Sequence, residues 1–215
     1  MMDDVPRITY LGQSGFYIET NDCSLLIDPT NKKSGDVVGD LVYCTHNHSD
    51  HTGGVDAFLE HNEDAIIVGN EQVMSSFPQY AERAKTVSDS EIFDFKSISM
   101  TFTKLRHGLF KGVYNLAVEV HIREFSFAHC GDAVSFEEFP SSPANILAIP
   151  VSGAFAAGPK KALDMIRNLP NPLPTVIPMH WLMRNPKSFC KKLRKELPQV
   201  NCIVPVTGEK IKGFE

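Results

Sequence analysis

The segment at residues 45–54 constrains this chain more than any other stretch of its sequence. It reads Thr-His-Asn-His-Ser-Asp-His-Thr-Gly-Gly, so three of the 8 histidines and one aspartate fall within six residues. Neutral imidazoles and carboxylates are ligands that zinc and similar divalent ions take in proteins. A solvated polar loop would leave this spacing unexplained. The cluster of His46, His48, Asp50 and His51 therefore predicts a metal site.

The residues around the cluster predict where it lies in the fold. Residues 41–45 form a short apolar, β-prone run that is typical of a buried strand, and residues 55–60 resemble the start of a helix. Loops that follow strands are where α/β sheets hold their sites. In an extended segment His46 and His48 point to one side, and the following turn redirects Asp50 and His51. One loop could then supply ligands to two metal ions.

Length and composition are those of one ordinary domain. A chain of 215 residues is long enough for a single domain over residues 1–215. Its content of 42% hydrophobic and 22% charged residues is usual for soluble proteins. The acidic N-terminus contains no apolar segment, and no run approaches the ~18 apolar residues of a membrane span. We therefore expect a cytoplasmic protein without a secretory signal or a membrane partner.

The cysteines and the net charge narrow the class further. The 5 cysteines are odd in number and form no C-x-x-C pair, which predicts reduced thiols rather than disulfides. They are Cys23, Cys44, Cys130, Cys190 and Cys202. A net charge of −5 provides no electrostatic footprint for a polyanion. We expect a small-molecule substrate and no nucleic-acid partner.

Strands alternate with short helices along the chain. In the first half we predict strands at 7–11, 16–20, 24–27, 41–45 and 65–69, a polar loop at 30–39, and helices near 55–61 and 71–77. In the second half we predict strands at 92–95, 98–105, 115–122, 124–128, 146–151, 176–180 and 202–206, and helices at 160–169 and 187–197. This order fits two sheets packed together with helices outside.

Three more polar residues follow predicted strands and could complete a metal site. They are His107, Asp132 and His180. A strand end holds a side chain rigidly at a common rim, which makes these residues better candidates than loop residues. Each has a simpler interpretation as well, because Asp132 could be a turn residue and the histidines could be core residues.

Taken together, these segments resemble the metallo-β-lactamase superfamily. Residues 45–51 look like its signature, residues 129–132 and 177–180 look like its later aspartate and histidine segments, and His107 stands where another histidine is expected. Residues 10–15, 27–29 and 149–153 look most like the small stand-alone hydrolases related to L-ascorbate-6-phosphate lactonase. The resemblance covers roughly residues 7–182. The chain departs from the pattern at Gln13, where a histidine is frequent, and at Ala133, where a hydroxyl residue is common.

The resemblance implies an α/β fold (α+β in some schemes), a four-layer αβ/βα sandwich with the site at one edge of two sheets. It implies one metal ion bound by His46, His48 and His107, and a second bound by Asp50, His51 and His180. Asp132 would bridge the two ions. Asp28 would orient a ligand histidine from behind.

The role of His129 is open at this point. It could be a ligand, a residue that orients a ligand, or part of a strand face. We favour the second role.

The function implied is hydrolysis of an ester, lactone or phosphoester of a small molecule by a metal-bound hydroxide. Asp50 would be both ligand and proton acceptor. The two divalent ions would be Zn²⁺, with Mn²⁺, Ni²⁺ or Fe²⁺ as alternatives, because His and Asp ligands suit all of them. Lysines on or near the predicted loops could contact an anionic substrate, but we favour the simpler interpretation that they are mobile surface residues. They are Lys32, Lys33, Lys111, Lys160 and Lys161.

Three other classes use the same residues. A phosphodiesterase or nuclease could use the same site, but the acidic net charge of the chain disfavours nucleic acid as its substrate. A redox di-iron protein is disfavoured because the full hydrolase ligand set is present. A metal-binding protein without hydrolytic activity is disfavoured by the same completeness. Exposed edges of such sandwiches often pair, so a homo-oligomer is a further expectation.

Overall fold

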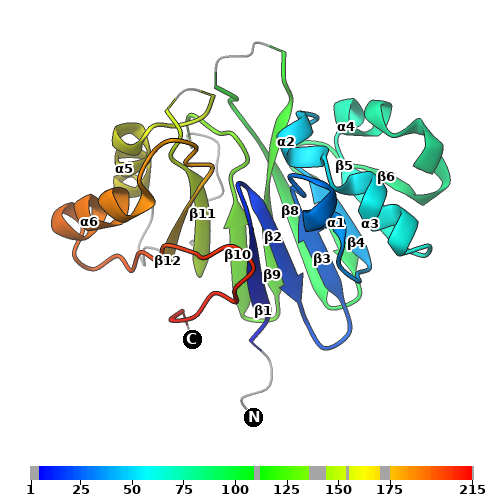
Figure 1. Ribbon diagram of the computed structural model, residues 1–215, viewed down its shortest axis with the longest axis horizontal. Helices are drawn as coiled ribbons and strands as arrows, with labels where there is room; N and C mark the ends of the chain where they lie inside the picture. Colours follow the sequence, from blue (N-terminus) through cyan, green and yellow to red (C-terminus); the bar gives the residue numbers. More distant parts are fainter. Residues whose placement is uncertain (1–4, 109–111, 136–143, 154, 170–174, 215) are drawn as a thin grey trace.

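Two mixed sheets of six strands each form the centre of the molecule (Figure 1). The computed structural model describes residues 5–108, 112–135, 144–153, 155–169 and 175–214. The first sheet contains β1 (Arg7–Gly12), β2 (Gly15–Glu19), β3 (Ser24–Ile27), β4 (Leu41–Cys44), β5 (Ile66–Gly69) and β6 (Ala84–Thr86), in that order. The second contains, from edge to edge, β12 (Thr175–Met179), β11 (Ile146–Pro150), β10 (Phe125–His129), β9 (Asn115–Ile122), β8 (Ile98–Leu105) and β7 (Ile92–Phe95).

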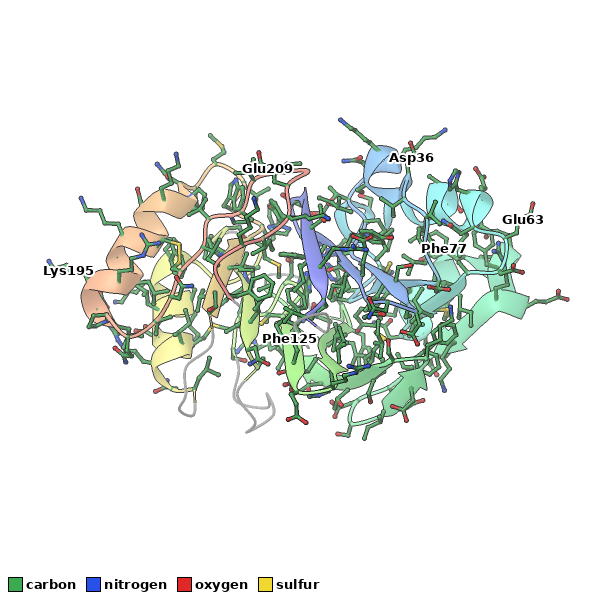
Figure 2. The ribbon with its side chains drawn as sticks, turned by 90° about the horizontal axis from the view of Figure 1, so that it is seen from below. Asp36, Glu63, Phe77, Phe125, Lys195 and Glu209 are labelled. Carbon is green, nitrogen blue, oxygen red and sulfur yellow. A yellow bond between two sulfur atoms is a disulfide. The ribbon has the colours of Figure 1, made fainter. Side chains whose placement is uncertain are left out.

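The helices lie on the outer sides of the sheets. The N-terminal half has α1 (Lys32–Gly35), α2 (Ser49–Thr52), α3 (Val55–His61), α4 (Glu71–Ser76) and the 3₁₀ helix η1 (Pro78–Arg83), and the C-terminal half has α5 (Pro159–Arg167) and α6 (Pro186–Glu196). In Figure 2, Lys195 of α6 and Glu63, just beyond α3, lie at opposite ends of the molecule. The predicted αβ/βα sandwich is therefore confirmed. None of the described helices has the length and apolarity needed to cross a membrane.

Alternation along the strands explains why the two sheets pack face to face. In β8, Ile98, Met100 and Phe102 are buried and belong to one apolar cluster with Val118 and Val120 of the adjacent strand β9. Side chains of the first sheet complete the same cluster. Burying each large apolar side chain contributes about 1.5–3 kcal/mol, so this layer is a main source of stability.

Two smaller apolar clusters join the helices to the sheets. Phe58 and Leu59 of α3 pack on the first sheet, and Leu163 and Ile166 of α5 pack on the second. The helices are short, and such helices depend on this packing rather than on their own propensity.

The predicted strand at 202–206 is wrong. Only Cys202 pairs there, in an isolated bridge with Val176 of β12. Pro205 has no N–H to donate, which works against a continued ladder in this segment.

The prediction of reduced thiols is wrong for one pair, because Cys190 and Cys202 form a disulfide. Cys190 lies on the buried face of α6, and Cys202 lies beside β12, so their Cα atoms come within 5.5 Å. A separation of 12 residues carries no sign of this contact in the sequence. The other three cysteines are free and buried.

Two local predictions need smaller corrections. The polar segment 30–39 contains the helical turn α1, which Asn31 caps by accepting a hydrogen bond from Ser34 N at 3.2 Å. The elements η1 and β6 were not predicted. The strand β6 is only three residues long and shows no clear alternation of apolar and polar residues.

Candidate metal centre

The ends of several strands converge at one edge of the sandwich. His46 follows β4 in the first sheet, while His107, Asp132 and His180 follow β8, β10 and β12 in the second. These three strands of the second sheet run in the same direction, so their carboxyl ends share one edge. An isolated bridge between His107 and Ala133 holds two of these ends together.

The segment after β4 turns into a helix where the sequence suggested a loop. His48 is the N-cap of α2, and Asp50 and His51 lie on that helix. Asp50 and His51 therefore stand on a different element from His46, although the ring centroids of His46 and His51 lie 4.0 Å apart.

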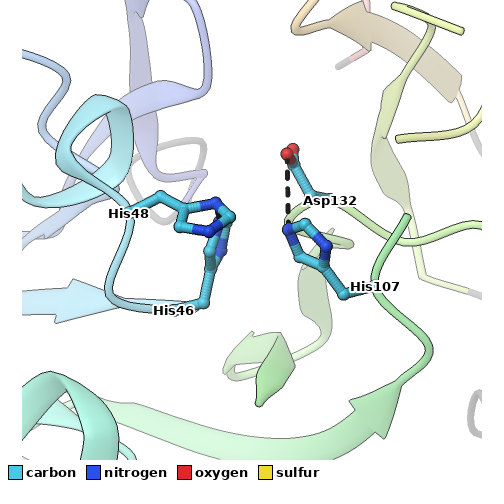
Figure 3. Close-up of side chains that lie close together, drawn as sticks. All are labelled: His46, His48, His107 and Asp132. Atoms are coloured by element: carbon cyan, nitrogen blue, oxygen red, sulfur yellow. Dashed lines mark hydrogen bonds and ion pairs between the residues drawn. The ribbon is translucent and has the colours of Figure 1, made fainter. Parts of the chain in front are cut away.

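All seven predicted ligands come together in two neighbouring groups. The first group is His46, His48, His107 and Asp132 (Figure 3), and the second is Asp50, His51 and His180. In each group one ligating atom per residue lies within 4.8 Å of the others.

Asp132 belongs to the first group and also lies close to the second. Its Oδ2 is 3.7 Å from His107 Nε2, and its Oδ1 is 3.4 Å from Nε2 of both His51 and His180. Asn115 fixes the backbone at this point by accepting a hydrogen bond from Asp132 N at 3.0 Å. One carboxylate therefore reaches into both groups.

Residues behind the histidines determine which ring nitrogen carries the proton. Thr45 donates its hydroxyl proton to Asp28 Oδ2 at 2.8 Å, so its oxygen accepts from His46 Nδ1 at 3.0 Å. His51 Nδ1 lies 2.6 Å from the same Asp28 oxygen and donates to it. Nε2 is then the nitrogen of each ring left for a metal ion, and Nε2 of His46 lies 3.0 Å from Nδ1 of His48.

Burial and neighbouring charges shift the histidine pKa values differently in the two groups of candidate ligands. Burial, together with the neighbouring imidazoles, lowers the pKa of His46, and burial lowers the pKa of His107 to about 4. Burial alone would lower the pKa of His51, but the carboxylates of Asp28 and Asp132 outweigh it and raise the pKa. The first group therefore offers neutral ligands, and the position of His51 attracts positive charge.

The polar atoms at the centre fit a cation. His51 Nε2 and Asp132 Oδ1 are buried and make no hydrogen bond within the described part of the chain. Buried polar atoms rarely stay unsatisfied in native proteins. A cation between a nitrogen lone pair and a carboxylate oxygen satisfies both, so the donor set fits a divalent metal ion.

Asp28 organises the centre from the end of β3. It is fully buried and also accepts a hydrogen bond from Thr45 N at 2.8 Å. It therefore touches His51 directly and reaches His46 through Thr45, which is the geometry expected of a residue that orients ligand histidines.

Both ring nitrogens of His129 are used within the protein. Gly131 N donates to Nδ1 at 3.1 Å, so Nε2 carries the proton and donates to Ser14 O at 2.9 Å. The ring is buried and ties the β1–β2 turn to the segment that carries Asp132. This geometry leaves no nitrogen of His129 for a metal.

Thr45 and Asn115 were not predicted as supporting residues, and Gln13 was named in the sequence only as a departure from the family pattern. Thr45 and Asn115 are buried polar residues at the site edge, and Gln13 donates from Nε2 to Asp50 Oδ2 at 3.2 Å. Thr45 stood next to the cluster and could have been found as a hydroxyl beside a ligand. The sequence contained no comparable sign for Asn115.

The predicted anion contacts are dispersed. Lys32 and Lys33 line a surface hollow with Glu60 and His61, and Lys161 lines another with Arg106. Lys111 lies outside the described residues.

Comparison with known proteins gives the family. Residues 7–180 match the family model described as "Beta-lactamase superfamily domain". A curated relative, the UPF0173 metal-dependent hydrolase of Lysinibacillus sphaericus (strain C3-41), is 24% identical and aligns over 97% of this chain and 100% of its own length. The relative YtkL of Bacillus subtilis (strain 168), also named a UPF0173 metal-dependent hydrolase, is 23% identical over 87% of this chain and 92% of its own.

Solved structures show the same fold. Igni18, described as a novel metallo hydrolase from Ignicoccus hospitalis, superposes with a TM-score of 0.81 at 18% identity and covers 96% of this chain and 97% of its own. The metallo-β-lactamase fold protein YhfI from Bacillus subtilis reaches a TM-score of 0.81 at 16% identity, with 97% and 99% coverage. The chain therefore belongs to the beta-lactamase superfamily, among the metal-dependent hydrolases of the metallo-β-lactamase fold.

Proposed function

We propose that the protein holds two divalent metal ions and hydrolyses an ester, lactone or phosphoester of a small molecule. One observation carries the proposal, namely the placement of the Asp132 carboxylate within 3.7 Å of imidazole nitrogens from both groups of candidate ligands. A carboxylate shared in this way is suited to bridge two ions. His46, His48 and His107 would hold the first ion, and Asp50, His51 and His180 the second.

Two such ions supply Lewis-acid chemistry and lower the pKa of a water toward ~7. The protein contributes ligands held in fixed orientations by buried partners. Asp50 has a different role, because its side chain is 45% exposed while the side chains of His51 and Asp132 are almost fully buried. It is therefore the carboxylate of the centre that solvent and substrate can reach, and the one suited to accept a proton.

The charge state of Asp50 suits a metal ligand. Burial raises its pKa, but the hydrogen bond from His180 and the charges of His51 and His180 outweigh this and hold the pKa below the usual range. Asp50 is therefore ionised at neutral pH, which is the form that a metal ligand requires.

The side chains that could act as protein nucleophiles near the centre are unsuited to it. Ser14 Oγ is 3.3 Å from His51 Nδ1, but the residue is fully buried. Cys130 is also fully buried, and burial raises the pKa of its thiol. A buried neutral thiol is inert. These observations support attack by water rather than by the protein.

We propose a type of metal ion and a class of substrate. His and Asp ligands without Cys suit Zn²⁺ first, with Mn²⁺, Ni²⁺ or Fe²⁺ as alternatives. The expected substrate is a small molecule that could be anionic, and the net charge of −5 disfavours nucleic acid.

The test combines metal analysis with an activity screen. Protein purified without chelator should contain two equivalents of a divalent metal and should cleave a member of a panel of esters, lactones, thioesters and phosphodiesters. Asp50→Ala should lower that activity by about 10²- to 10⁴-fold. Asp56→Ala, on the exposed side of α3, is the matched control and should have normal activity.

Three results would contradict the proposal. Full hydrolytic activity of Asp50→Ala with unchanged metal content would remove Asp50 from the reaction. Two bound metals without activity on any substrate class would favour a binding protein. Cleavage confined to nucleic acid, with steep salt dependence, would favour a nuclease.

A further inference from the structure

Gln13 lies where three separate segments meet. It stands in the turn between β1 and β2, directly after Gly12, and has a φ of +53°. Non-glycine residues seldom adopt this left-handed region, and such residues cluster at functional sites. The turn therefore holds Gln13 in a demanding conformation beside the candidate metal centre.

The backbone of Gln13 anchors one candidate ligand. Its carbonyl oxygen accepts a hydrogen bond from His180 N at 2.8 Å and another from the Tyr10 hydroxyl at 3.0 Å. His180 also has a positive φ, of 48°. A fixed acceptor on the facing turn stabilises that conformation of His180.

The side chain of Gln13 reaches a second candidate ligand. Its Nε2 is 3.2 Å from Asp50 Oδ2. A carboxylate oxygen accepts this hydrogen bond, so the Gln13 amide presents its NH₂ group to Asp50.

Asp50 otherwise has little support from outside the centre. His46 is held by Thr45 and His51 by Asp28, whereas the other hydrogen-bond partner of the Asp50 carboxylate is His180, itself a candidate ligand, at 3.1 Å. Among the described residues, Gln13 is the one side chain outside the ligand set that hydrogen-bonds Asp50. The Asp50 side chain is 45% exposed, so its position is not fixed by packing either.

We propose that Gln13 is a positioning residue for the second group, and that it sets the affinity of the second metal ion by orienting the Asp50 carboxylate. This inference rests on the two-metal function proposed above. It goes beyond that function because it predicts a selective effect: loss of the Gln13 amide weakens the second ion and leaves the first unchanged, since no bond from Gln13 reaches His46, His48 or His107.

The variant Gln13→Met tests this directly. Methionine has a similar length and strains the turn as glutamine does, but it has no donor for Asp50. The backbone carbonyl that anchors His180 is retained. Gln79→Met is the matched control, because Gln79 makes the same kind of amide–carboxylate bond, to Asp56 at 3.1 Å, on the exposed surface. Gln13→His restores a ring N–H donor.

The measurement is titration of the metal-free full chain with Zn²⁺ against a competing chelator, with thermal unfolding of the metal-free variants alongside. We expect Gln13→Met to weaken the second equivalent by about 10- to 100-fold and to leave the first within about twofold. Gln79→Met should bind both equivalents as the wild type does. Gln13→His should recover most of the second affinity.

Two results for the variants would overturn the inference. One is unchanged second-ion affinity in Gln13→Met. The other is an equal loss at both ions with a fall in the melting temperature of the metal-free protein, which would make Gln13 a structural clamp. If the wild type itself binds fewer than two equivalents, the two-metal function fails and the inference falls with it.

Discussion

Two buried carboxyl groups, one in each sheet, are treated in opposite ways by this fold. Asp28, at the site edge of the first sheet, is fully buried and accepts hydrogen bonds from Thr45 N, the Thr45 hydroxyl and His51. Glu119, in the middle of β9 in the second sheet, is 3% exposed, and its Oε1 has no hydrogen-bond partner within the described residues. Equal burial therefore has unequal consequences.

The difference shows where the fold supplies polar partners. Burying a charge is costly unless hydrogen bonds replace water, and the candidate centre supplies them while the middle of the second sheet does not. Burial accordingly raises the pKa of Glu119 to about 7, which favours its neutral form. For these two carboxyl groups, hydrogen-bond partners are supplied at the edge of the sheets where the candidate ligands converge.

The largest effect is expected from Asp28→Ala. The change leaves Thr45 N and His51 Nδ1 as buried donors without an acceptor. We expect a loss of about 3–5 kcal/mol in the free energy of unfolding, measured by urea titration of chelator-treated protein. Metal affinity should also fall by about 10- to 100-fold, because two ligand histidines lose their orientation.

Asp28→Asn is the conservative comparison for that experiment. It keeps one carbonyl acceptor in the same place and should fall between the wild type and Asp28→Ala. Wild-type stability and metal affinity in Asp28→Ala would show that the hydrogen bonds of Asp28 are replaceable, and the contrast with Glu119 would disappear.

The contrast between Asp28 and Glu119 also shows what sequence reasoning could reach. The resemblance to the metallo-β-lactamase superfamily implied that Asp28 orients a ligand histidine, and its hydrogen bond from His51 is compatible with that role. Glu119 lies within the predicted strand 115–122. A strand prediction alone could not show that its side chain is covered in the folded protein.

The fold and the site were predictable to different depths. Most strands lie within a residue or two of their predicted positions, because period-two alternation is a local property. The Cys190–Cys202 disulfide and the contact between Gln13 and Asp50 join residues that the sequence keeps apart, and only the packed tertiary structure brings them together. The candidate ligands were visible because His107, Asp132 and His180 each follow a recognisable strand.

The second-largest effect is expected from Glu119→Gln, and it depends on pH. The folded pKa of about 7 lies above the usual value of 4.5, so the folded state binds the proton more tightly. Wild-type stability is therefore fully present below pH 4.5 and is lost as the pH rises toward 7. At 1.36 kcal/mol per pH unit, the loss relative to Glu119→Gln should reach about 3 kcal/mol.

Urea unfolding of both proteins between pH 4 and 8 measures this difference. His121 lies close to Glu119, with Nε2 4.0 Å from Oε2, and burial lowers the pKa of His121. This lowering weakens any compensation of the Glu119 charge by His121 as the pH rises. Parallel stability curves for the two proteins would mean that Glu119 finds a partner and that the contrast with Asp28 is false.

The smallest effect is expected from a carboxyl group that is paired but exposed. Glu91 Oε1 lies 2.8 Å from Lys85 Nζ, and the Glu91 side chain is 31% exposed. The hydrogen bond from Lys85 lowers the pKa of Glu91, so its contribution is present above the usual pKa and is lost as the pH falls, which is opposite in sign to Glu119. Solvent screening limits the cost of Glu91→Gln to less than about 1 kcal/mol, and 1 M salt should reduce it further. A salt-independent loss comparable to that of Asp28→Ala would contradict this expectation. It would show that solvent exposure does not limit the contribution of a paired carboxyl group in this fold.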